Sequence, residues 1–440
     1  MRVCVFSHSY VVAANHAKLE RLARMPGVEL SVICPRRIRR EFGTYPVERT
    51  HHSDYAIVPL RALYTSHNYR FLYLAAGRAL AQLRPDLIHL EEEPWSLAAW
   101  QAIRYARGAR RRPNPLPLGK GAAEGAGASS ALSRESAELR AAGEGGPKVI
   151  FFTWQNLWRR HGFPHETIER AVHAEAAAAI AGNAEAAELL RQKGFRKPIH
   201  VLPQLGVDEA IYARRDEAPL RRKLGLRGFV IGFAGRLVPE KGIDLLLEAF
   251  AAVLTRRVDE HGTPNAERSS ASLLVVGGGP LRAELARRFA QPPFAGRAVL
   301  LDTVPHGEMP RYLNCMDALV LPSRAAPHWK EQFGHVLIEA MACEVPVVGS
   351  TCGEIPNVIG DAGLTFPEGD AAALAAALQR LMASPDLRAD LAARGRRRVL
   401  ERFTDARIAQ ATFEIWQQVL GAGGAGDSTT RRTTTSTRKH

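Results

Sequence analysis

Residues 229–242 read Phe229-Val-Ile-Gly-Phe-Ala-Gly-Arg-Leu-Val-Pro-Glu-Lys-Gly242. The apolar run Phe229–Phe233 predicts a buried strand, and the glycines after it predict a loop that leads into a helix. In this loop Arg236 offers a planar fork of donors and Lys241 a point charge, which together suit a diphosphate. Two cations just before a helix are unfavourable unless an anion is bound there. The stretch therefore predicts a phosphate site at the end of a strand.

A second segment, Glu331-Gln-Phe-Gly-His-Val-Leu-Ile-Glu339, carries two carboxylates eight residues apart. It reads as a loop that enters a helix near Gly334, where free backbone amides favour an anion. Carboxylates are usually solvated, but the apolar residues around Glu339 place this pair at the edge of a core. Glu339 can accept hydrogen bonds from sugar hydroxyls, while Glu331 reaches another part of the ligand. Two cations for phosphates and two carboxylates for hydroxyls predict a nucleotide-sugar site.

Apolar runs alternate with helical patterns along most of the chain, which is typical of doubly wound α/β proteins. The predicted strands are Val3–Phe6, Leu30–Cys34, Tyr55–Val58, Asp86–Leu90, Val149–Phe152, Ala179–Ala181, Val230–Ala234, Leu273–Val276, Val299–Leu301, Ala318–Leu321 and Pro346–Val348. The predicted helices include Lys18–Arg24, Phe71–Leu83, Trp95–Arg107, His165–Ala177, Asp244–Leu254, Leu281–Phe289, His335–Met341 and Ala371–Met382. Because open α/β sheets bind ligands beyond the carboxyl ends of their strands, Gly235, Gly277 and Ser323 should face one crevice.

The chain of 440 residues is too long for one ordinary core. We expect a first domain over 1–205, a second over 206–403 and a final amphipathic helix over 404–420, with the change of domain between Leu202 and Arg222. Residues 108–147 are rich in Gly, Ala, Pro and Ser and are predicted to be a disordered insertion. A disordered basic tail is expected over 421–440, and a shorter surface loop over 259–272.

Positive charge is concentrated in the first half. Residues 1–205 carry 29 Lys and Arg against 18 Asp and Glu, a net charge of +11, whereas residues 206–420 carry 26 of each. One interpretation is a solvated surface; the other is attraction to anionic lipid headgroups, at about 1 kcal/mol for each nearby cation. Nucleic acid would feel the same field, and composition does not separate these partners. No nucleic-acid partner is expected.

The five cysteines, an odd number without Cys-x-x-Cys spacing, argue against a disulfide framework or a zinc site and favour buried small hydrophobes. No apolar stretch of eighteen residues could span a bilayer. The chain starts on a predicted strand rather than on a signal peptide. A cytoplasmic protein is expected, at the inner face of the membrane if the lipid contact exists.

The two segments, in this order along the chain and each between a predicted strand and a predicted helix, resemble family 4 (group 1) of the retaining glycosyltransferases. The resemblance covers most of residues 1–420 and is strong after about residue 200 and weak before it. Those enzymes have the GT-B fold, in which two Rossmann-like domains face a central cleft and a C-terminal helix crosses back to the first domain. The resemblance implies that Arg236 and Lys241 hold the donor diphosphate, that Glu339 binds the ribose and that Glu331 faces the donor sugar. The remaining donor-binding residues expected from it are Gly235, Gly278, Val304, Phe333, Gly334 and His335. The first domain should hold the acceptor, which is often lipid-linked in this family.

The first half departs from the family where the acceptor and the reaction centre lie. The segment after the first strand, Ser7-His8-Ser9-Tyr10, lacks the usual Gly-Gly turn. Gln155 stands where many members have a histidine, and an amide orients a hydroxyl but cannot move a proton. Gln204 likewise replaces the usual asparagine. The expected acceptor-side residues are Ser9, Glu92, Gln155 and Asn156.

Three adjacent carboxylates, Glu91-Glu92-Glu93, end a predicted strand in this half. Such a run usually forms a solvated turn, which is the majority interpretation here. The alternative is that Glu92 or Glu93 grips acceptor hydroxyls.

The resulting prediction is retaining transfer of a sugar from a nucleotide-diphosphate sugar to a saccharide or lipid-linked acceptor, in polysaccharide or cell-envelope biosynthesis. Arg236, Lys241 and the helix end at Gly334 would stabilise the leaving diphosphate without a cofactor or metal ion, since no Asp-x-Asp run suggests one. Two alternatives remain. One is a GT-B nucleotide-sugar epimerase, which needs no acceptor. The other is a non-catalytic nucleotide-sugar-binding or scaffold protein, which the amide at Gln155 keeps open.

Overall fold

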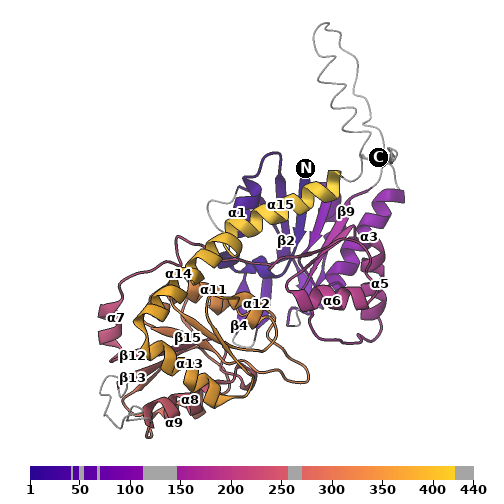
Figure 1. Ribbon diagram of the computed structural model, residues 1–440. Coiled ribbons are helices and arrows are strands. Elements are labelled where there is room, and N and C mark those ends of the chain that lie inside the picture. Colours follow the sequence, from indigo (N-terminus) through magenta and orange to yellow (C-terminus); the bar gives the residue numbers. More distant parts are fainter. Residues whose placement is uncertain (41–42, 49–53, 67–69, 112–145, 256–269, 422–440) are drawn as a thin grey trace, which may run out of the picture.

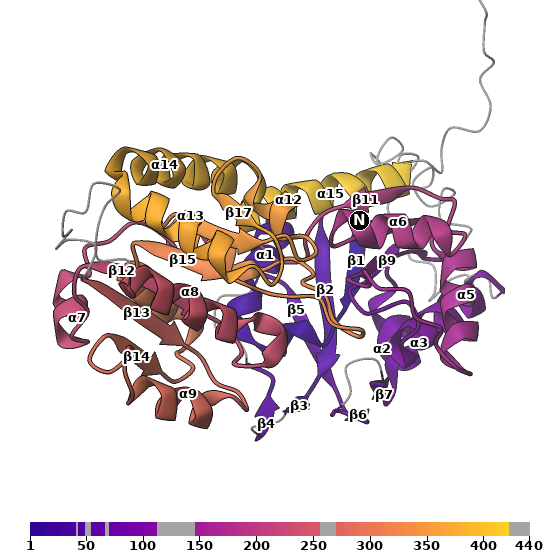
Figure 2. The same cartoon turned by 60° about the horizontal axis from the view of Figure 1, so that its bottom comes forward.

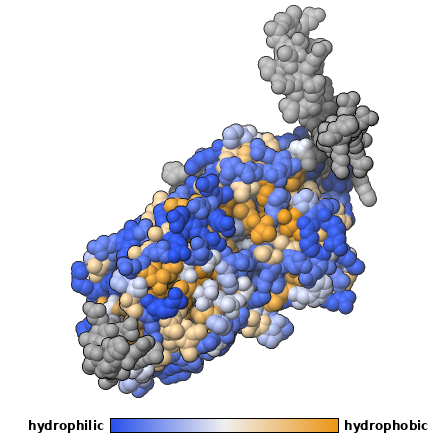
Figure 3. All heavy atoms as spheres, in the orientation of Figure 1, coloured by the Kyte–Doolittle hydropathy of each residue, from blue (hydrophilic) through white to orange (hydrophobic). Residues whose placement is uncertain are grey.

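The computed structural model describes residues 1–40, 43–48, 54–66, 70–111, 146–255 and 270–421. Within them the chain forms two α/β domains that lie side by side, each built on its own parallel sheet (Figures 1 and 2). Hydrophilic side chains cover most of the face in Figure 3, and hydrophobic ones gather in separate patches on it. No helix in the described ranges is both long and apolar enough to cross a bilayer.

The first domain contains a seven-stranded parallel sheet in the order β11-β10-β9-β8-β1-β2-β5. Its strands are β1 (Arg2–Phe6), β2 (Glu29–Pro35), β5 (Ala56–Leu60), β8 (Leu87–Leu90), β9 (Lys148–Thr153), β10 (Ala178–Ala181) and β11 (Ile199–Val201). Its helices are α1 (Ala17–Ala23), α2 (Ala76–Leu83), α3 (Leu97–Arg111), α5 (His165–Glu175) and α6 (Ala184–Gln192). All residues of β8 and β10 are buried, as expected for central strands covered by helices on both faces.

The second domain contains six parallel strands in the order β14-β13-β12-β15-β16-β17. They are β12 (Phe229–Ala234), β13 (Ala271–Val276), β14 (Ala298–Leu301), β15 (Ala318–Leu321), β16 (Val347–Ser350) and β17 (Leu364–Phe366). The helices are α7 (Ala218–Lys223), α8 (Ile243–Thr255), α9 (Arg282–Phe289), α10 (Met309–Leu313), α11 (His335–Ala342), α12 (Ile355–Ile359) and α13 (Ala371–Ala383). This strand order, 3-2-1-4-5-6 along the domain, is that of a Rossmann sheet.

Two long helices at the end of the chain connect the domains. Helix α14 (Pro385–Arg402) packs on the second domain, and α15 (Asp405–Gly421) lies along α1 on the first (Figures 1 and 2). The apolar face of α15 enters the first domain's core, where Trp416 is fully buried in the same cluster as Val5 and Leu19. The predicted return of the last helix to the first domain is therefore confirmed, and so is the GT-B architecture.

Some predicted elements were wrong or missing. The helix expected over 71–83 begins only at Ala76, because Leu72–Tyr73 forms the short strand β7 against β6 (Ala62–Leu63). The hairpin β3 (Arg37–Arg40) and β4 (Gly43–Pro46), the edge strands β11 and β17, and helices α6 and α14 were not predicted.

Both expected surface segments also begin or end differently. Residues 108–111 of the expected insertion are helical, as part of α3, and β13 already begins at Ala271 within the expected loop. Residues 112–145 of the insertion, residues 259–269 of the loop and the tail after Gly421 lie outside the described residues. All five cysteines are buried, as expected.

Candidate functional site

The two sequence segments meet where the second sheet changes direction. Strands β12 and β15 are neighbours that connect to opposite sides of the sheet, so a crevice opens beyond their carboxyl ends. The loop after β12 ends at Gly242, whose φ is +66° and whose Cβ, if present, would lie 2.0 Å from the carbonyl oxygen of Pro322 after β15. Only a glycine fits this approach, and it brings the cation loop against the carboxylate loop.

Lys241 and Glu331 form an ion pair in this crevice. Lys241 Nζ donates to Glu331 Oε2 over 2.6 Å, and Ser323 Oγ donates to the same oxygen over 2.8 Å. Arg236 is exposed, and no hydrogen bond or ion pair is recorded for it within the described part of the chain. The structure thus brings two of the three predicted catalytic residues into contact and leaves the third as an available guanidinium.

The carboxylate loop enters α11 through a glycine in the left-handed region. Gly334 has φ +82°, and a Cβ there would lie 2.8 Å from Leu321 Cδ2. One turn into the helix, Glu339 lies 3.9 Å from His306 Nδ1 and close to the Tyr212 hydroxyl. Burial raises the pKa of Glu339 to about 7, against the lowering effect of the Tyr212 hydrogen bond. Burial also lowers the pKa of His335 to about 4, so that this imidazole is neutral.

The other predicted donor-binding segments lie along the same edge. A Cβ on Gly277 would lie 1.9 Å from Gly235 O, and one on Gly278 would lie 3.0 Å from Thr303 Oγ1. Val304 follows Thr303 in the loop after β14 and is half-buried. Phe333 turns instead towards the first domain, where its ring centre is 5.9 Å from that of Trp154.

The predicted solvated turn at Glu91-Glu92-Glu93 is wrong. Glu91 and Glu92 are buried, because the loops after β1 and β8 meet at the switch point of the first sheet. Glu92 Oε1 accepts from the backbone N of His8 over 2.7 Å, and its Oε2 lies 2.8 Å from His8 Nδ1. Ser9 follows in the same loop. Both oxygens of the Glu92 carboxylate therefore already have partners within the first domain.

Glu93, by contrast, is half-buried and faces the cleft beside β9. It accepts hydrogen bonds from Thr153 Oγ1 (2.6 Å) and the backbone N of Trp154 (3.0 Å). Burial raises its pKa to about 7, opposed by these two hydrogen bonds.

Gln155 is held by residues that the sequence did not single out. Lys193 Nζ donates to Gln155 Oε1 over 2.7 Å and to Glu169 Oε1 over 2.6 Å, and Gln155 Nε2 lies 3.3 Å from His161 Nε2. The His161 ring stacks on Trp95 at 4.1 Å, and burial, together with the charge of Lys193, lowers its pKa to about 4. A neutral imidazole is therefore present beside Gln155. No sequence signal beyond its basic, aromatic surroundings could have placed His161 there.

The carboxylate loop also contacts the first domain directly. Asn156 Nδ2 lies 3.4 Å from Glu331 O, and Asn183 Nδ2 donates to Gln332 O over 2.8 Å. Lys330 forms an ion pair with Glu185. A cavity of about 450 Å³ lies at this junction, between the loop before α5 and residues 328–332.

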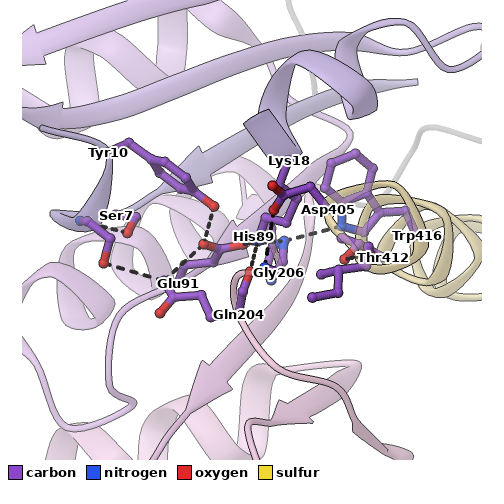
Figure 4. Close-up of polar contacts among 12 residues, drawn as sticks. Ser7, Tyr10, Lys18, His89, Glu91, Gln204, Gly206, Asp405, Thr412 and Trp416 are labelled. Atoms are coloured by element: carbon purple, nitrogen blue, oxygen red, sulfur yellow. Dashed lines mark hydrogen bonds and ion pairs between the residues drawn. The ribbon is translucent and has the colours of Figure 1, made fainter. Parts of the chain in front are cut away.

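Gln204, in the linker between the domains, belongs to a buried polar network (Figure 4). Lys18 pairs with Glu91 and donates to Gln204 O over 2.8 Å, while Gln204 Nε2 donates to Glu91 Oε2 over 3.1 Å. The Tyr10 hydroxyl donates to the same carboxylate over 2.6 Å. Burial alone would raise the pKa of Glu91, but the charge of Lys18 and the hydrogen bonds from Lys18 and Tyr10 act together against it, so that the pKa is lowered. The linker is thereby fixed to the first domain.

Comparison with known proteins agrees with this geometry. Residues 228–384 match the family model Glycosyl transferases group 1. The D-inositol 3-phosphate glycosyltransferase of Salinispora arenicola is 31% identical over 224 residues, which are 49% of this chain and 47% of that protein. The N-acetyl-alpha-D-glucosaminyl L-malate synthase of Bacillus anthracis is 29% identical over 218 residues, 49% of this chain and 52% of that protein. The chain thus spans about half the length of the curated relatives it matches.

Among solved structures, the sucrose-phosphate synthase of Thermosynechococcus elongatus has a TM-score of 0.66 and 18% identity, covering 96% of this chain and all of that one. Anabaena HepE in complex with UDP has a TM-score of 0.65 and 16% identity, over 95% and 99% of the two chains. At these identities the likeness shows the fold. Residues 228–384 therefore resemble the glycosyl transferases of group 1, and the two domains together form the GT-B fold.

Proposed function

We propose that the protein is a retaining, metal-independent glycosyltransferase that moves a sugar from a nucleotide-diphosphate sugar to an acceptor held by the first domain. The observation that carries the proposal is the arrangement at the β12–β15 switch point. There an available guanidinium, Arg236, stands in the same loop as Lys241, which pairs with Glu331 of the facing loop. A Rossmann sheet offers its ligand site at this place.

The ion pair suggests how the donor would bind. An entering diphosphate competes with Glu331 for Lys241, and the released carboxylate is then free to accept hydrogen bonds from the donor sugar. Arg236 and Lys241 stabilise charge on the leaving diphosphate, an effect worth about 2.7–4 kcal/mol of barrier for one such donor. The acceptor oxygen forms its bond to the anomeric carbon as the bond to the diphosphate oxygen breaks. The acceptor's proton passes to the departing phosphate.

The names of relatives support transfer to a small polar acceptor or a lipid-linked one. They describe transfer to D-inositol 3-phosphate, synthesis of a glucosaminyl L-malate and mannosylation of a phosphatidylinositol monomannoside. HepE has been solved with UDP-glucose, which is a nucleotide sugar. We propose the same class of donor here, with polysaccharide or cell-envelope intermediates as the acceptor class.

The first experiment is a thermal-shift titration with UDP, GDP, ADP and their common sugar conjugates. A ligand that binds only the folded state raises its melting temperature. We expect one nucleoside diphosphate to stabilise the wild type and to act more weakly on Arg236→Ala. Arg287→Ala, which removes an exposed arginine from α9, should respond like the wild type.

Turnover then separates the alternatives. A transferase releases nucleoside diphosphate in step with glycosylated acceptor, whereas an epimerase gives product without any acceptor. Stabilisation by nucleotide with neither product would favour a binding protein. No stabilisation by any nucleotide would contradict the proposed donor site.

A further inference from the structure

The cavity between the domains is strongly basic. Its lining includes two loops, one of the first domain (155–162) and one of the second (328–332). Four cationic side chains line it, Arg70, Arg159, Arg160 and Lys330, together with three imidazoles, His161, His165 and His328. The one carboxylate among these lining residues is Glu93. A neutral saccharide does not need such a surplus of positive charge.

This cavity shares a wall with the proposed donor site. Trp329 lines it, and the centre of its ring is 5.2 Å from Lys241 Nζ. Asn156 lines it as well and lies 3.4 Å, through Nδ2, from Glu331 O. A molecule in the cavity would therefore lie beside the loop that carries Glu331.

The charges of two adjacent arginines are not balanced locally. Lys330 forms an ion pair with Glu185. Arg159 instead donates to the backbone carbonyl oxygen of His328, and this carbonyl group has no formal charge to balance that of the guanidinium. Arg160 is exposed, and no hydrogen bond or ion pair is recorded for it within the described ranges. Two guanidinium groups that line one cavity without a paired carboxylate raise the energy of the empty site, and a bound oxyanion offsets their charge. Guanidinium forks match phosphate oxygens in geometry as well as in charge.

We propose that the acceptor carries a phosphate group, which Arg159 and Arg160 receive in this cavity, and that the hydroxyl to be glycosylated lies towards Glu93 and Glu331. This inference rests on the proposed function and deepens it, because it names the chemical class of the second substrate. The phosphate could belong to a soluble phosphate ester or to a lipid headgroup. Both place the same dianionic or monoanionic group between the two arginines.

The test uses the full chain saturated with the nucleoside diphosphate that binds it, so that the donor phosphate site is already occupied. Calorimetry then compares sn-glycerol 3-phosphate with glycerol. Co-sedimentation compares phosphatidylglycerol vesicles with phosphatidylcholine vesicles. The variants are Arg160→Ala, Arg160→Lys and the control Arg170→Ala, which removes an exposed arginine on α5 away from the cavity. Melting temperatures establish that each variant is folded.

We expect one phosphate-bearing probe to bind while its neutral counterpart does not. Arg160→Ala should weaken this binding by about tenfold or more, the usual effect of losing one hydrogen-bonded charge. Arg160→Lys should retain part of it, and Arg170→Ala all of it. Binding of the soluble ester alone assigns a soluble acceptor, and binding of vesicles alone assigns a lipid-borne one.

The inference is overturned if neither phosphate probe binds the nucleotide-loaded protein, or if Arg160→Ala binds as tightly as Arg170→Ala. In both cases the proposed donor site stands, because the nucleotide has bound. If no nucleotide binds at all, the proposed function fails, and the assignment of an acceptor fails with it.

Discussion

At the scale of single residues, the pair Lys241–Glu331 has two tasks that exclude each other. In the structure each side chain neutralises the other, and both are largely withdrawn from solvent, with 15% and 9% of the side chain exposed. In the proposed donor complex, Lys241 serves the diphosphate and Glu331 the sugar. Among the described residues, Arg236 has no such partner to leave. The two cations should therefore respond differently to removal.

Lys241→Met should lower the free energy of unfolding by about 1.5–3 kcal/mol, because Glu331 loses the charged hydrogen bond that compensates its burial. Arg236→Met should leave stability within about 0.5 kcal/mol, as expected of an exposed side chain. Both variants should lose affinity for the nucleoside diphosphate. Urea unfolding and calorimetry measure the two effects separately. Equal stabilities for the two variants would show that the ion pair does not contribute to folding.

Glu339 should make nucleotide affinity depend on pH. Its pKa is raised by burial from 4.5 to about 7, so that the carboxyl is mostly protonated at pH 6 and mostly ionised at pH 8. A carboxylate accepts hydrogen bonds better than the acid, so affinity should rise roughly tenfold across this range if only the ionised form binds the ribose. Stability changes in the opposite sense. Because the pKa of Glu339 is higher in the folded state than in the unfolded state, Glu339 contributes stability to the folded protein in full below pH 4.5. This contribution is lost as the pH rises through 7.

Glu339→Gln should remove the contribution of Glu339 to the pH dependence of nucleotide affinity and of stability. The ionisation of the nucleotide phosphates affects the variant and the wild type alike. The comparison of affinities at pH 6, 7 and 8 is therefore made between variant and wild type. Parallel curves for the two would contradict the assigned role of Glu339.

The sequence predicted which residues lie at this site better than it predicted which residues they contact. Arg236, Lys241, Glu331 and Glu339 stand on the same edge of the second sheet, as expected. The Lys241–Glu331 contact joins residues ninety positions apart, and it depends on how closely two loops approach. No local pattern carries that information. His161 is only six positions from Gln155, but no sequence pattern indicates that the chain between them folds back to bring the two side chains together.

At the scale of elements, the parallel strands of both sheets were predictable because they are continuous apolar runs. Three-residue edge strands such as β11 and β17 are half-buried and lack such runs. The break before α2 was hidden as well. There Ala75 adopts φ +66°. This left-handed conformation is usually predicted from a glycine, and here the residue is an alanine.

The glycine that starts α11 should be indispensable. Gly334→Ala forces a residue with a Cβ into the left-handed region, at roughly 1–2 kcal/mol, and the added Cβ also presses on Leu321 Cδ2. We expect a loss of about 2 kcal/mol in the free energy of unfolding and weaker nucleotide binding, because the loop that carries Glu331 shifts. Gly77→Ala in α2, where nothing lies within 4 Å of the added Cβ, is the control and should lose no stability. A normal melting temperature for Gly334→Ala would contradict this explanation.

At the scale of the whole molecule, the chain passes between the domains twice, and the two passages are hydrogen-bonded to each other. Val207 N donates to Phe403 O over 3.0 Å, and Asp405 N donates back to Val207 O over 3.0 Å. The buried network of Lys18 and Glu91 then fixes the first passage to the first domain. Each passage therefore restrains the other, and we expect the domains to move relative to each other by rotation about this doubled connection.

Across the cleft, polar contacts between described residues of the two domains accompany the ring contact of Phe333 with Trp154. Asn183 is central to them, because its two side-chain atoms have separate tasks. Its Oδ1 accepts from Ala186 N over 2.7 Å and caps α6, while its Nδ2 donates to Gln332 O over 2.8 Å. A substitution that keeps one task and abolishes the other can therefore separate stability from closure.

Asn183→Asp retains an N-cap of equal quality but places a carboxylate against the carbonyl oxygen of Gln332. We expect little change in melting temperature and a shift of the domain equilibrium towards the open form by about three- to tenfold, the equivalent of one lost hydrogen bond. Small-angle scattering should show a larger radius of gyration, and the Michaelis constant for the acceptor should rise. Asn183→Ala should open the molecule similarly but also lose about 1 kcal/mol of stability with the cap. Scattering curves for Asn183→Asp that superimpose on the wild type would show that the carboxylate loop reaches the first domain without this contact.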